Sequence, residues 1–314
     1  MRIGVGELRS RAQALWERMG ACYLCPRRCG ADRLDGERGF CGAAATVPLS
    51  AAVAHHGEEP PVSGTGGAGN LFFGGCNLRC TYCQNHQISA FEIPMPEYDP
   101  AGIADHMLGL QDQGVHNIGW VTPTHLLPLL MVAWAIAWER GLRLPLIYNT
   151  GTYEFPEVLR GLDGVVDVYL PDVKYADGDT ATALSHAPDY WPIAQAALEE
   201  MVRQCGALAC GDDGLVRRGV IVRHLVLPNE LAGTEEILRY LAQLRPRPAL
   251  SLLAQFHPEA GCDHPLLQRP VSEAEYARAR RWADLYGPFE GWVQASSSPS
   301  FYRPDFTSCQ PFVK

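Results

Sequence analysis

Short apolar runs alternate with amphipathic stretches along most of the chain. In the stretches between the runs, apolar positions recur every three to four residues, as on one face of a helix. Apolar runs separated by helical stretches are typical of parallel strands joined by covering helices. The pattern therefore predicts strands at 70–75, 117–121, 144–148, 165–170, 220–227, 250–254 and 291–295.

The amphipathic stretches predict the helices that connect these strands. An N-terminal helix is expected at 7–19, and connecting helices at 100–113, 126–140, 154–161, 187–205, 234–244 and 272–286. Roughly six such units predict an α/β protein with a partial TIM-type (β/α)6 barrel, whose chemistry lies at the C-terminal ends of the strands. A doubly wound sheet shows the same alternation and stays open as the alternative.

Composition and charge narrow the class of protein. The chain has 314 residues, of which 47% are hydrophobic and 19% charged, so it is globular. Its net charge is −9 and no dense Lys/Arg run occurs, so we expect no nucleic-acid partner. The longest apolar run, 126–138, contains Pro128 and is too short to cross a bilayer, so we expect no membrane contact. The N-terminus has no apolar export signal, and we expect a cytoplasmic protein.

Cysteine distribution divides the chain. Seven of the eleven cysteines fall between Cys22 and Cys83. In a chain with no export signal they indicate metal or redox ligands rather than disulfides. We expect a helix and cysteine-rich extension over 1–66, and a barrel with a C-terminal extension over 67–314. Residues 296–312 are rich in turn formers and could close the bottom of the barrel or approach the substrate mouth, but we expect a surface tail there.

Three cysteines, Cys76, Cys80 and Cys83, follow the first predicted strand with the spacing C-x3-C-x2-C. Three thiolates can hold a four-iron cluster and leave one iron open, whereas zinc would need a fourth ligand, for which His86 is the nearest candidate. Tyr82 stands directly before the last cysteine. This pattern resembles the radical S-adenosylmethionine (SAM) superfamily. The resemblance implies a [4Fe-4S] cluster, SAM bound to the open iron, and Tyr82 near the adenine.

Further motifs extend the resemblance over most of the chain. The segments FFGGCNLRCTYCQN, VTPTH, IYNTGTYE, YLPDVKY and VRHLVLP are similar to uncharacterised iron–sulfur proteins related to pyruvate formate-lyase activating enzyme. The resemblance implies reductive cleavage of SAM to a 5′-deoxyadenosyl radical that takes a hydrogen atom, with flavodoxin or ferredoxin as electron donor. The substrate could be a glycyl-radical enzyme, or instead a small molecule or peptide. An iron–sulfur or zinc protein without catalysis is the remaining alternative.

The same resemblance implies SAM contacts, while no catalytic side chain beyond the cluster is assigned. The implied contacts, besides Tyr82, are Thr122, Thr124, Asn149, Asp172, Lys174, Arg223 and His257. The two threonines stand where the family has Gly-Gly-Glu, and Gly57-Glu58-Glu59 precedes the cysteine loop, so we do not expect it to substitute. Asp172 and Lys174 are two apart on a strand and face the same side, although a plain ion pair is the alternative. For His257, a core histidine is equally compatible.

Four N-terminal cysteines form a second candidate site. Cys22, Cys25, Cys29 and Cys41 have the spacing C-x2-C-x3-C-x11-C. Four thiolates fully ligate either zinc or an iron–sulfur cluster, and spacing alone does not separate these from unmetallated structural cysteines. The remaining cysteines are scattered, and we expect buried small side chains: Cys205, Cys210, Cys262 and Cys309.

Overall fold

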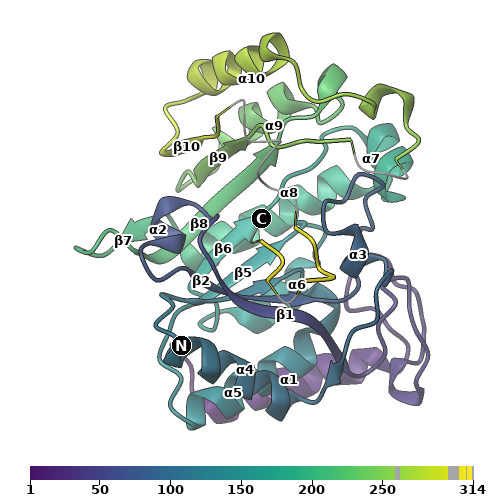
Figure 1. The fold of residues 1–314 in the computed structure, drawn as a ribbon, viewed down its shortest axis with the longest axis vertical. Helices are drawn as coiled ribbons and strands as arrows, with labels where there is room; N and C mark the ends of the chain where they lie inside the picture. The colour runs from purple at the N-terminus through teal and green to yellow at the C-terminus, as the bar shows by residue number, and fades with distance from the viewer. Residues whose placement is uncertain (259–261, 296–303, 309, 313–314) are drawn as a thin grey trace.

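The computed structural model describes residues 1–258, 262–295, 304–308 and 310–312. Within these residues one open sheet runs in the order β10-β9-β8-β6-β5-β4-β2-β1-β3, with β7 paired to β8 (Figure 1). The strands are β1 Val47–His55, β2 Ala68–Phe73, β3 Glu97–Tyr98, β4 Ile118–Val121, β5 Leu146–Thr150, β6 Val168–Pro171, β7 Ala209–Cys210, β8 Val216–Leu225, β9 Ala249–Leu253 and β10 Gly291–Val293. All seven predicted strands occur, parallel and in chain order, from β2 to β10. The fold is the expected partial barrel, and its sheet does not close.

Helices cover the sheet and connect its parallel strands. Figure 1 shows α1 beside α4 and α5 at one end of the sheet, and α9 with α10 at the other. The helices are α1 Val5–Trp16, α2 Pro60–Ser63, α3 His86–Ser89, α4 Pro100–Asp112, α5 Leu127–Glu139, α6 Pro156–Leu159, α7 Gly178–Ser185, α8 Tyr190–Cys205, α9 Thr234–Leu241 and α10 Glu273–Tyr286. The helix predicted at 154–161 is shorter than expected, because a 3-10 turn at Arg160–Leu162 replaces its end.

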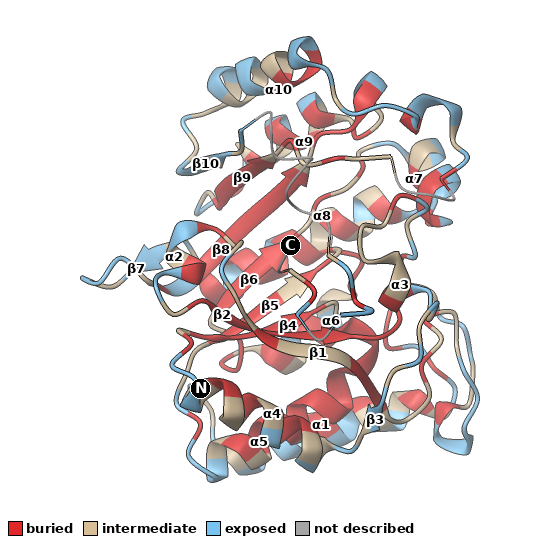
Figure 2. Cartoon of the chain, viewed as in Figure 1, coloured by how far each residue is buried: buried red, intermediate tan, exposed pale blue. Residues whose placement is uncertain are grey.

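Burial explains why these elements form. The parallel strands β2, β4 and β6 are wholly buried, whereas β10 at the edge of the sheet is partly exposed, and most helices bury one side and expose the other (Figure 2). On the inner side of α5, Trp134 packs edge-to-face against Trp120 of β4, with ring centroids 5.7 Å apart. Such large apolar contacts between layers supply most of the stability of an α/β domain.

The N-terminal extension adds an antiparallel strand that the sequence pattern does not reveal. β1 pairs with β2 from Leu49↔Phe73 to His55↔Ala68, and β3 pairs with the start of β1. Its segment, VPLSAAVAH, carries small residues in place of a continuous apolar run, so it shows no strand signal. Because β1 runs backwards along β2, it returns the chain to the N-terminal end of the parallel strands.

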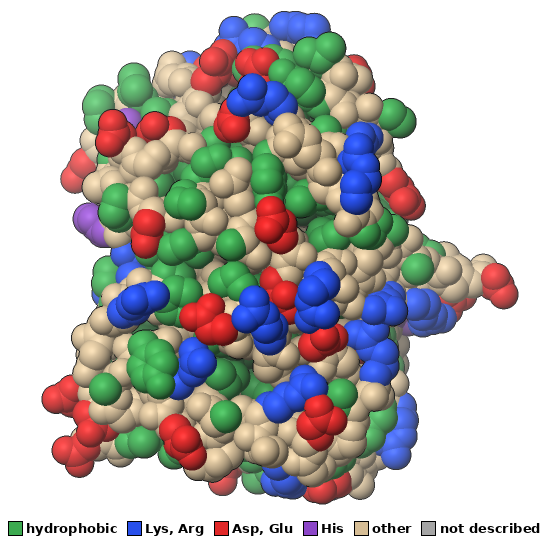
Figure 3. Space-filling model, turned by 180° about the vertical axis from the view of Figure 1, so that it is seen from behind, with side chains coloured by type: hydrophobic (Ala, Val, Ile, Leu, Met, Phe, Trp, Pro, Cys, Tyr) green, Lys and Arg blue, Asp and Glu red, His purple; other side chains and the backbone are tan. Residues whose placement is uncertain are grey.

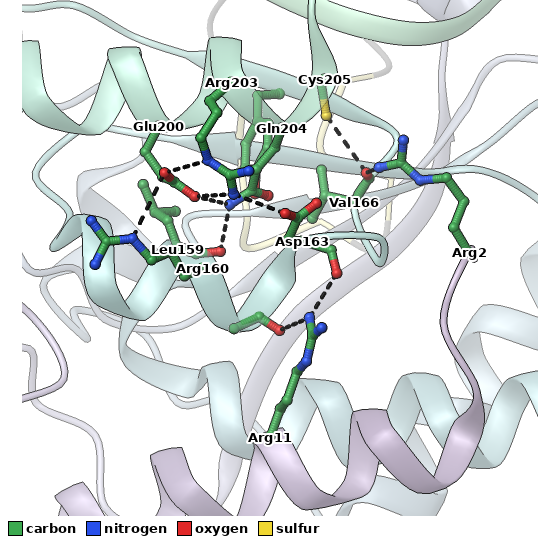
Figure 4. A network of polar contacts seen from close by, with 12 residues as sticks. Arg2, Arg11, Leu159, Arg160, Asp163, Val166, Glu200, Arg203, Gln204 and Cys205 are labelled. Carbon is green, nitrogen blue, oxygen red and sulfur yellow. Dashed lines mark hydrogen bonds and ion pairs between the residues drawn. The ribbon is translucent and has the colours of Figure 1, made fainter.

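A polar network ties the extension to the barrel (Figure 4). From α1, Arg11 donates to the carbonyl oxygens of Gly161 and Asp163 at 3.3 and 2.7 Å. The Asp163 carboxylate accepts a hydrogen bond of 2.8 Å from Arg203 of α8, which also pairs with Glu200. The extension and the barrel therefore share one continuous packed structure.

The outer surface shows no sorting of charge by sign on the face drawn in Figure 3, where acidic and basic side chains are interspersed. Among the helices of the described residues, none combines the length and the apolar character that crossing a membrane requires.

Candidate active site

A cavity of about 490 Å³ opens at the C-terminal ends of the parallel strands. Its lining comes from the cysteine loop after β2 and from residues at or just past the ends of β4, β5, β6, β8, β9 and β10. This is the edge at which a partial β/α barrel carries its chemistry, because several strand ends deliver side chains there together. Most of the predicted contacts lie in this lining: Cys76, Cys80, Tyr82, Cys83, Thr122, Asn149, Asp172, Lys174 and Arg223.

The three loop cysteines line one wall, and each sulfur accepts a hydrogen bond. Cys76 accepts one from the Leu78 backbone N–H at 3.3 Å, and Cys80 one from the Ser185 hydroxyl at 3.1 Å. Cys83 accepts one from the Ser89 hydroxyl at 3.5 Å. Hydrogen bonds to sulfur stabilise thiolates and tune the clusters that thiolates hold. The donor set therefore fits an iron–sulfur cluster held by three thiolates.

Tyr82 belongs to the same loop, between Cys80 and Cys83. Its ring packs edge-to-face against Tyr175 and Phe256, with centroids 6.3 and 5.9 Å apart. The ring is buried and also lines the cavity, so it offers an apolar surface to a flat ligand group such as adenine.

Asp172 and Lys174 project into the cavity together from the end of β6. The Lys174 Nζ donates to Asp172 Oδ2 at 3.2 Å. Burial lowers the pKa of Lys174, but the Asp172 carboxylate and Cys80 have a larger effect in the opposite direction. The pKa of Lys174 therefore lies well above its ordinary value. The cavity thus holds a permanent ammonium group beside a carboxylate.

Thr122 follows the end of β4 in an unusual backbone conformation. Its φ is +57°, which a β-branched residue rarely adopts, and its N–H donates to the Asn149 carbonyl oxygen at 2.8 Å. Left-handed β-branched residues are strained and cluster at binding sites. Thr122 and Asn149 both line the cavity next to the cysteine loop, since β4 pairs with β2.

The structure does not bring Thr124 and His257 into the cavity lining of the described residues. Thr124 is buried, and its hydroxyl donates its one proton to Glu154 Oε1 at 2.6 Å. The Nδ1 atom of His257 lies 2.7 Å from the Pro258 carbonyl oxygen, and Gln255 lines the cavity in its place. His125, next to Thr124, is buried with Nε2 2.9 Å from the Gly74 carbonyl oxygen.

The expectation that Gly57-Glu58-Glu59 lies away from the site is wrong. These residues line the same cavity from the side where the parallel strands begin, since β1 returns the chain to the start of β2 and Asn70 of β2 donates to Glu58 Oε1 at 2.6 Å. Glu59 accepts two hydrogen bonds from Arg223, at 2.9 and 2.5 Å, and Glu58 accepts another from the same guanidinium. Arg223, predicted to hold the SAM carboxylate, therefore binds two carboxylates of the protein itself.

The expectation of a C-terminal surface tail is wrong for Phe306 and Phe312, although Asp305, Thr307, Ser308 and Gln310 are exposed. Phe306 is buried, and Phe312 lines the cavity with its ring 5.1 Å from that of Phe72 and 4.1 Å from that of His55. The remaining positions, 296–303, 309 and 313–314, lie outside the described residues. Sparse aromatics in a turn-rich segment were the only sequence signal of this packing.

Sequence reasoning also missed a row of amides across the mouth. The Gln84 amide donates to the Gln255 carbonyl oxygen at 2.9 Å, and the Gln294 amide donates to Gln255 Oε1 at 2.8 Å. All three line the cavity and join the cysteine loop to the ends of β9 and β10. Isolated glutamines carry no motif, so only the fold brings them together.

Comparison with known proteins identifies the family. The model of the radical SAM superfamily matches residues 70–241, more than half of the chain. The chain therefore belongs to the radical SAM superfamily, and membership implies a [4Fe-4S] cluster and SAM. Cys76, Cys80 and Cys83, which line the cavity together, would hold such a cluster.

Two proteins of Methanocaldococcus jannaschii are similar over most of the chain. Uncharacterized protein MJ0674 is 29% identical over 275 residues, covering 84% of this chain and 75% of its own. Uncharacterized protein MJ0808 is 26% identical over 260 residues, covering 76% and 71%. Neither printed name carries an activity.

Two solved structures are also similar. A radical SAM methyltransferase from Sphaerobacter thermophilus superposes with a TM-score of 0.51 at 15% identity, over 77% of this chain and 68% of that one, and shows the same fold. A domain of pyruvate-formate lyase-activating enzyme from Bacteroides vulgatus gives a TM-score of 0.37 at 13% identity, over 62% and 91%.

Proposed function

We propose that this protein cleaves SAM reductively and uses the resulting 5′-deoxyadenosyl radical to take a hydrogen atom from a small molecule held in the same cavity. The bound cluster supplies the electron that breaks the bond between sulfur and the 5′-carbon of SAM. The chain's own residues bind and orient SAM, hold the substrate and keep water out.

The closure of the cavity on one side carries this proposal. The edge of the sheet beyond β2 is continued by β1, and Val53 and Ala54 of β1 form part of the lining. Phe312 covers the same side, against Phe72. A glycine on a large partner protein would have to displace these elements, whereas the space that SAM leaves in a cavity of about 490 Å³ suits a small substrate.

Three residues have roles in SAM binding under this proposal. Lys174 offers its ammonium group to the SAM carboxylate, and Asp172 accepts from the ribose hydroxyls. The strained turn at Thr122 lies beside the cysteine loop, where its oxygen atoms can accept from the SAM ammonium group. Arg223 does not contact SAM under this proposal but holds the carboxylates of Glu58 and Glu59 in the cavity lining.

Activation of a glycyl-radical enzyme stays the second candidate, and the sequence motifs related to pyruvate formate-lyase activating enzyme favour it. In either case the cluster needs a one-electron donor of low potential, for which a flavodoxin or ferredoxin is suited. A second metal at the N-terminal cysteines belongs to the proposed set of cofactors.

The test is a substrate search with reconstituted protein under anaerobic conditions. SAM and dithionite are added with either the low-molecular-weight or the macromolecular fraction of a cell extract, and 5′-deoxyadenosine is measured. The proposal expects stimulation by the small-molecule fraction, and deuterium transfer from a labelled substrate into 5′-deoxyadenosine. Stimulation by the macromolecular fraction alone, with a glycyl-radical EPR signal in a partner protein, would establish the activase instead.

A further inference from the structure

The loop of four N-terminal cysteines packs against the barrel rather than in solvent. Cys22, Cys25 and Cys41 are buried, and Cys29 is exposed. Cys22 is held by two backbone hydrogen bonds, one donated to the Ala31 carbonyl oxygen and one accepted from the Gly30 N–H, each 3.0 Å long. The loop therefore has a fixed shape that brings thiols distant in sequence into one neighbourhood.

A close approach of backbone to sulfur shows how tightly this loop is folded. A Cβ atom at Gly39 would lie 2.6 Å from Cys29 Sγ, closer than real Cβ atoms come to any neighbour. A side chain at residue 39 would therefore have to displace the sulfur of Cys29. The two segments that carry the four sulfur atoms are in direct contact.

A buried cation next to these sulfurs lacks an anionic partner. Arg33 has 0% relative exposure, and its guanidinium lies 3.9 Å from Cys22 Sγ. It donates to the carbonyl oxygens of His125 and Ala44 at 2.7 Å each, its Nε has no partner, and none of the ion pairs among the described residues includes it. A buried charge without a counter-charge is strongly destabilising, so a negative group is expected close by.

Four thiolates around a metal supply that negative charge. With Zn²⁺ or with a [4Fe-4S]²⁺ cluster, the complete centre carries two negative charges. We propose that Cys22, Cys25, Cys29 and Cys41 bind a metal as a four-thiolate centre whose negative charge is balanced by the buried guanidinium of Arg33. Among the described residues, no three Cys, His, Asp or Glu side chains converge tightly enough for a single ion, and this holds equally for Cys76, Cys80 and Cys83. The cysteine spacing fits either zinc or an iron–sulfur cluster.

Arg27 connects this centre to the loop that carries Cys76, Cys80 and Cys83. Its guanidinium donates to the carbonyl oxygens of Asn77 and Leu78, between Cys76 and Cys80, at 2.6 and 3.3 Å. It also donates to the Ser185 carbonyl oxygen at 2.5 Å, and the Ser185 hydroxyl donates to Cys80. A metal that fixes Cys25 thus also fixes Arg27 and, through it, the loop that holds the catalytic cluster.

The test separates the two sites by metal content. The full-length variant with Cys76→Ala, Cys80→Ala and Cys83→Ala is reconstituted anaerobically with iron and sulfide, and a second sample is prepared from zinc-supplemented growth. The expected result is that this variant keeps about half of the wild-type iron, with the charge-transfer absorption of a cluster. Retention of one zinc in place of that iron supports the same centre with the other metal. A variant that holds neither metal, although its far-UV circular dichroism matches the wild type, overturns the proposal.

Further variants test the charge balance. Cys22→Ser with Cys41→Ser is expected to lose the remaining metal, whereas Cys210→Ser, which changes an exposed cysteine on β7, is expected to keep it. Removing the metal by chelation is expected to lower the wild-type Tm by roughly 5–10 °C. For Arg33→Met the shift is expected to be less than half as large, because no buried cation is left unpaired. Equal shifts in both proteins would overturn the role of Arg33. None of these readouts needs SAM cleavage, so the proposed function can fail independently.

Discussion

Replacing Arg223 by Met tests whether this residue serves the protein or the ligand. Its guanidinium and the carboxylates of Glu58 and Glu59 are all buried, with side-chain exposures of 10, 10 and 5%. Removing one partner from such a set leaves charges buried without compensation, which costs about 3–5 kcal/mol. We therefore expect Arg223→Met to lower the free energy of unfolding by about that amount at pH 7.

The dependence on pH gives this prediction a second check. Burial raises the pKa of Glu59, but the charge and hydrogen bonds of Arg223 lower it further, so the net pKa lies below its ordinary value. A lowered pKa contributes stability that is present above the unfolded-state pKa and lost as pH falls through the folded-state pKa. The difference between wild type and Arg223→Met should therefore be largest near neutral pH and shrink on acidification.

The assay is chemical denaturation at several pH values, with SAM binding measured in parallel by calorimetry. A matched variant adds Glu58→Gln and Glu59→Gln to Arg223→Met, and it should recover much of the lost stability because no buried charge remains unpaired. The reasoning is refuted if Arg223→Met unfolds within about 1 kcal/mol of wild type at every pH while its affinity for SAM falls more than tenfold.

Three shorter predictions concern other parts of the structure. Burial raises the pKa of Glu154 to about 7. The stability that this residue contributes is therefore present below its unfolded-state pKa and lost as pH rises through about 7. In denaturation experiments the free energy of unfolding of the wild type should fall by roughly 2–4 kcal/mol between pH 5 and 8, and Glu154→Gln should abolish this decrease. Lys174→Met should weaken SAM binding by about 1.5–3 kcal/mol in calorimetry, through loss of a charge-assisted hydrogen bond. Unchanged affinity would show that Lys174 forms only an ion pair with Asp172 and does not bind SAM. Phe312→Ala should lower the free energy of unfolding by about 1–3 kcal/mol and increase the 5′-deoxyadenosine formed without substrate, since it opens the cavity wall. A decrease in the 5′-deoxyadenosine formed without substrate would contradict that role.

The sequence predicts the parallel part of the fold because the strands there centre on a short apolar run, as at 220–222 between the arginines of β8. β4 and β6, buried along their whole length, carry that signal fully. β1 does not, because VPLSAAVAH consists largely of small residues. Its antiparallel course along β2 could not be predicted, and neither could the approach of Glu58 and Glu59 to the cavity.

The candidate site divides in the same way. Cys76, Cys80, Cys83 and Asp172 belong to local motifs, which place the cysteines just after β2 and Asp172 just after β6. The partners of Arg223 and the packing of Phe312 depend on contacts between segments far apart in the chain. No local pattern records such contacts, because they form only when the whole sheet has assembled.

The most direct test of the central claim is the formation of 5′-deoxyadenosine. The wild-type protein, reconstituted anaerobically with iron and sulfide and reduced by dithionite, is incubated with SAM, and the product is quantified by mass spectrometry beside the variant lacking Cys76, Cys80 and Cys83. The account predicts 5′-deoxyadenosine and methionine in equal amounts from the wild type and none from the variant. A wild-type protein that carries its cluster but forms no 5′-deoxyadenosine, or a variant that forms it at the wild-type rate, would contradict the assignment of this cavity.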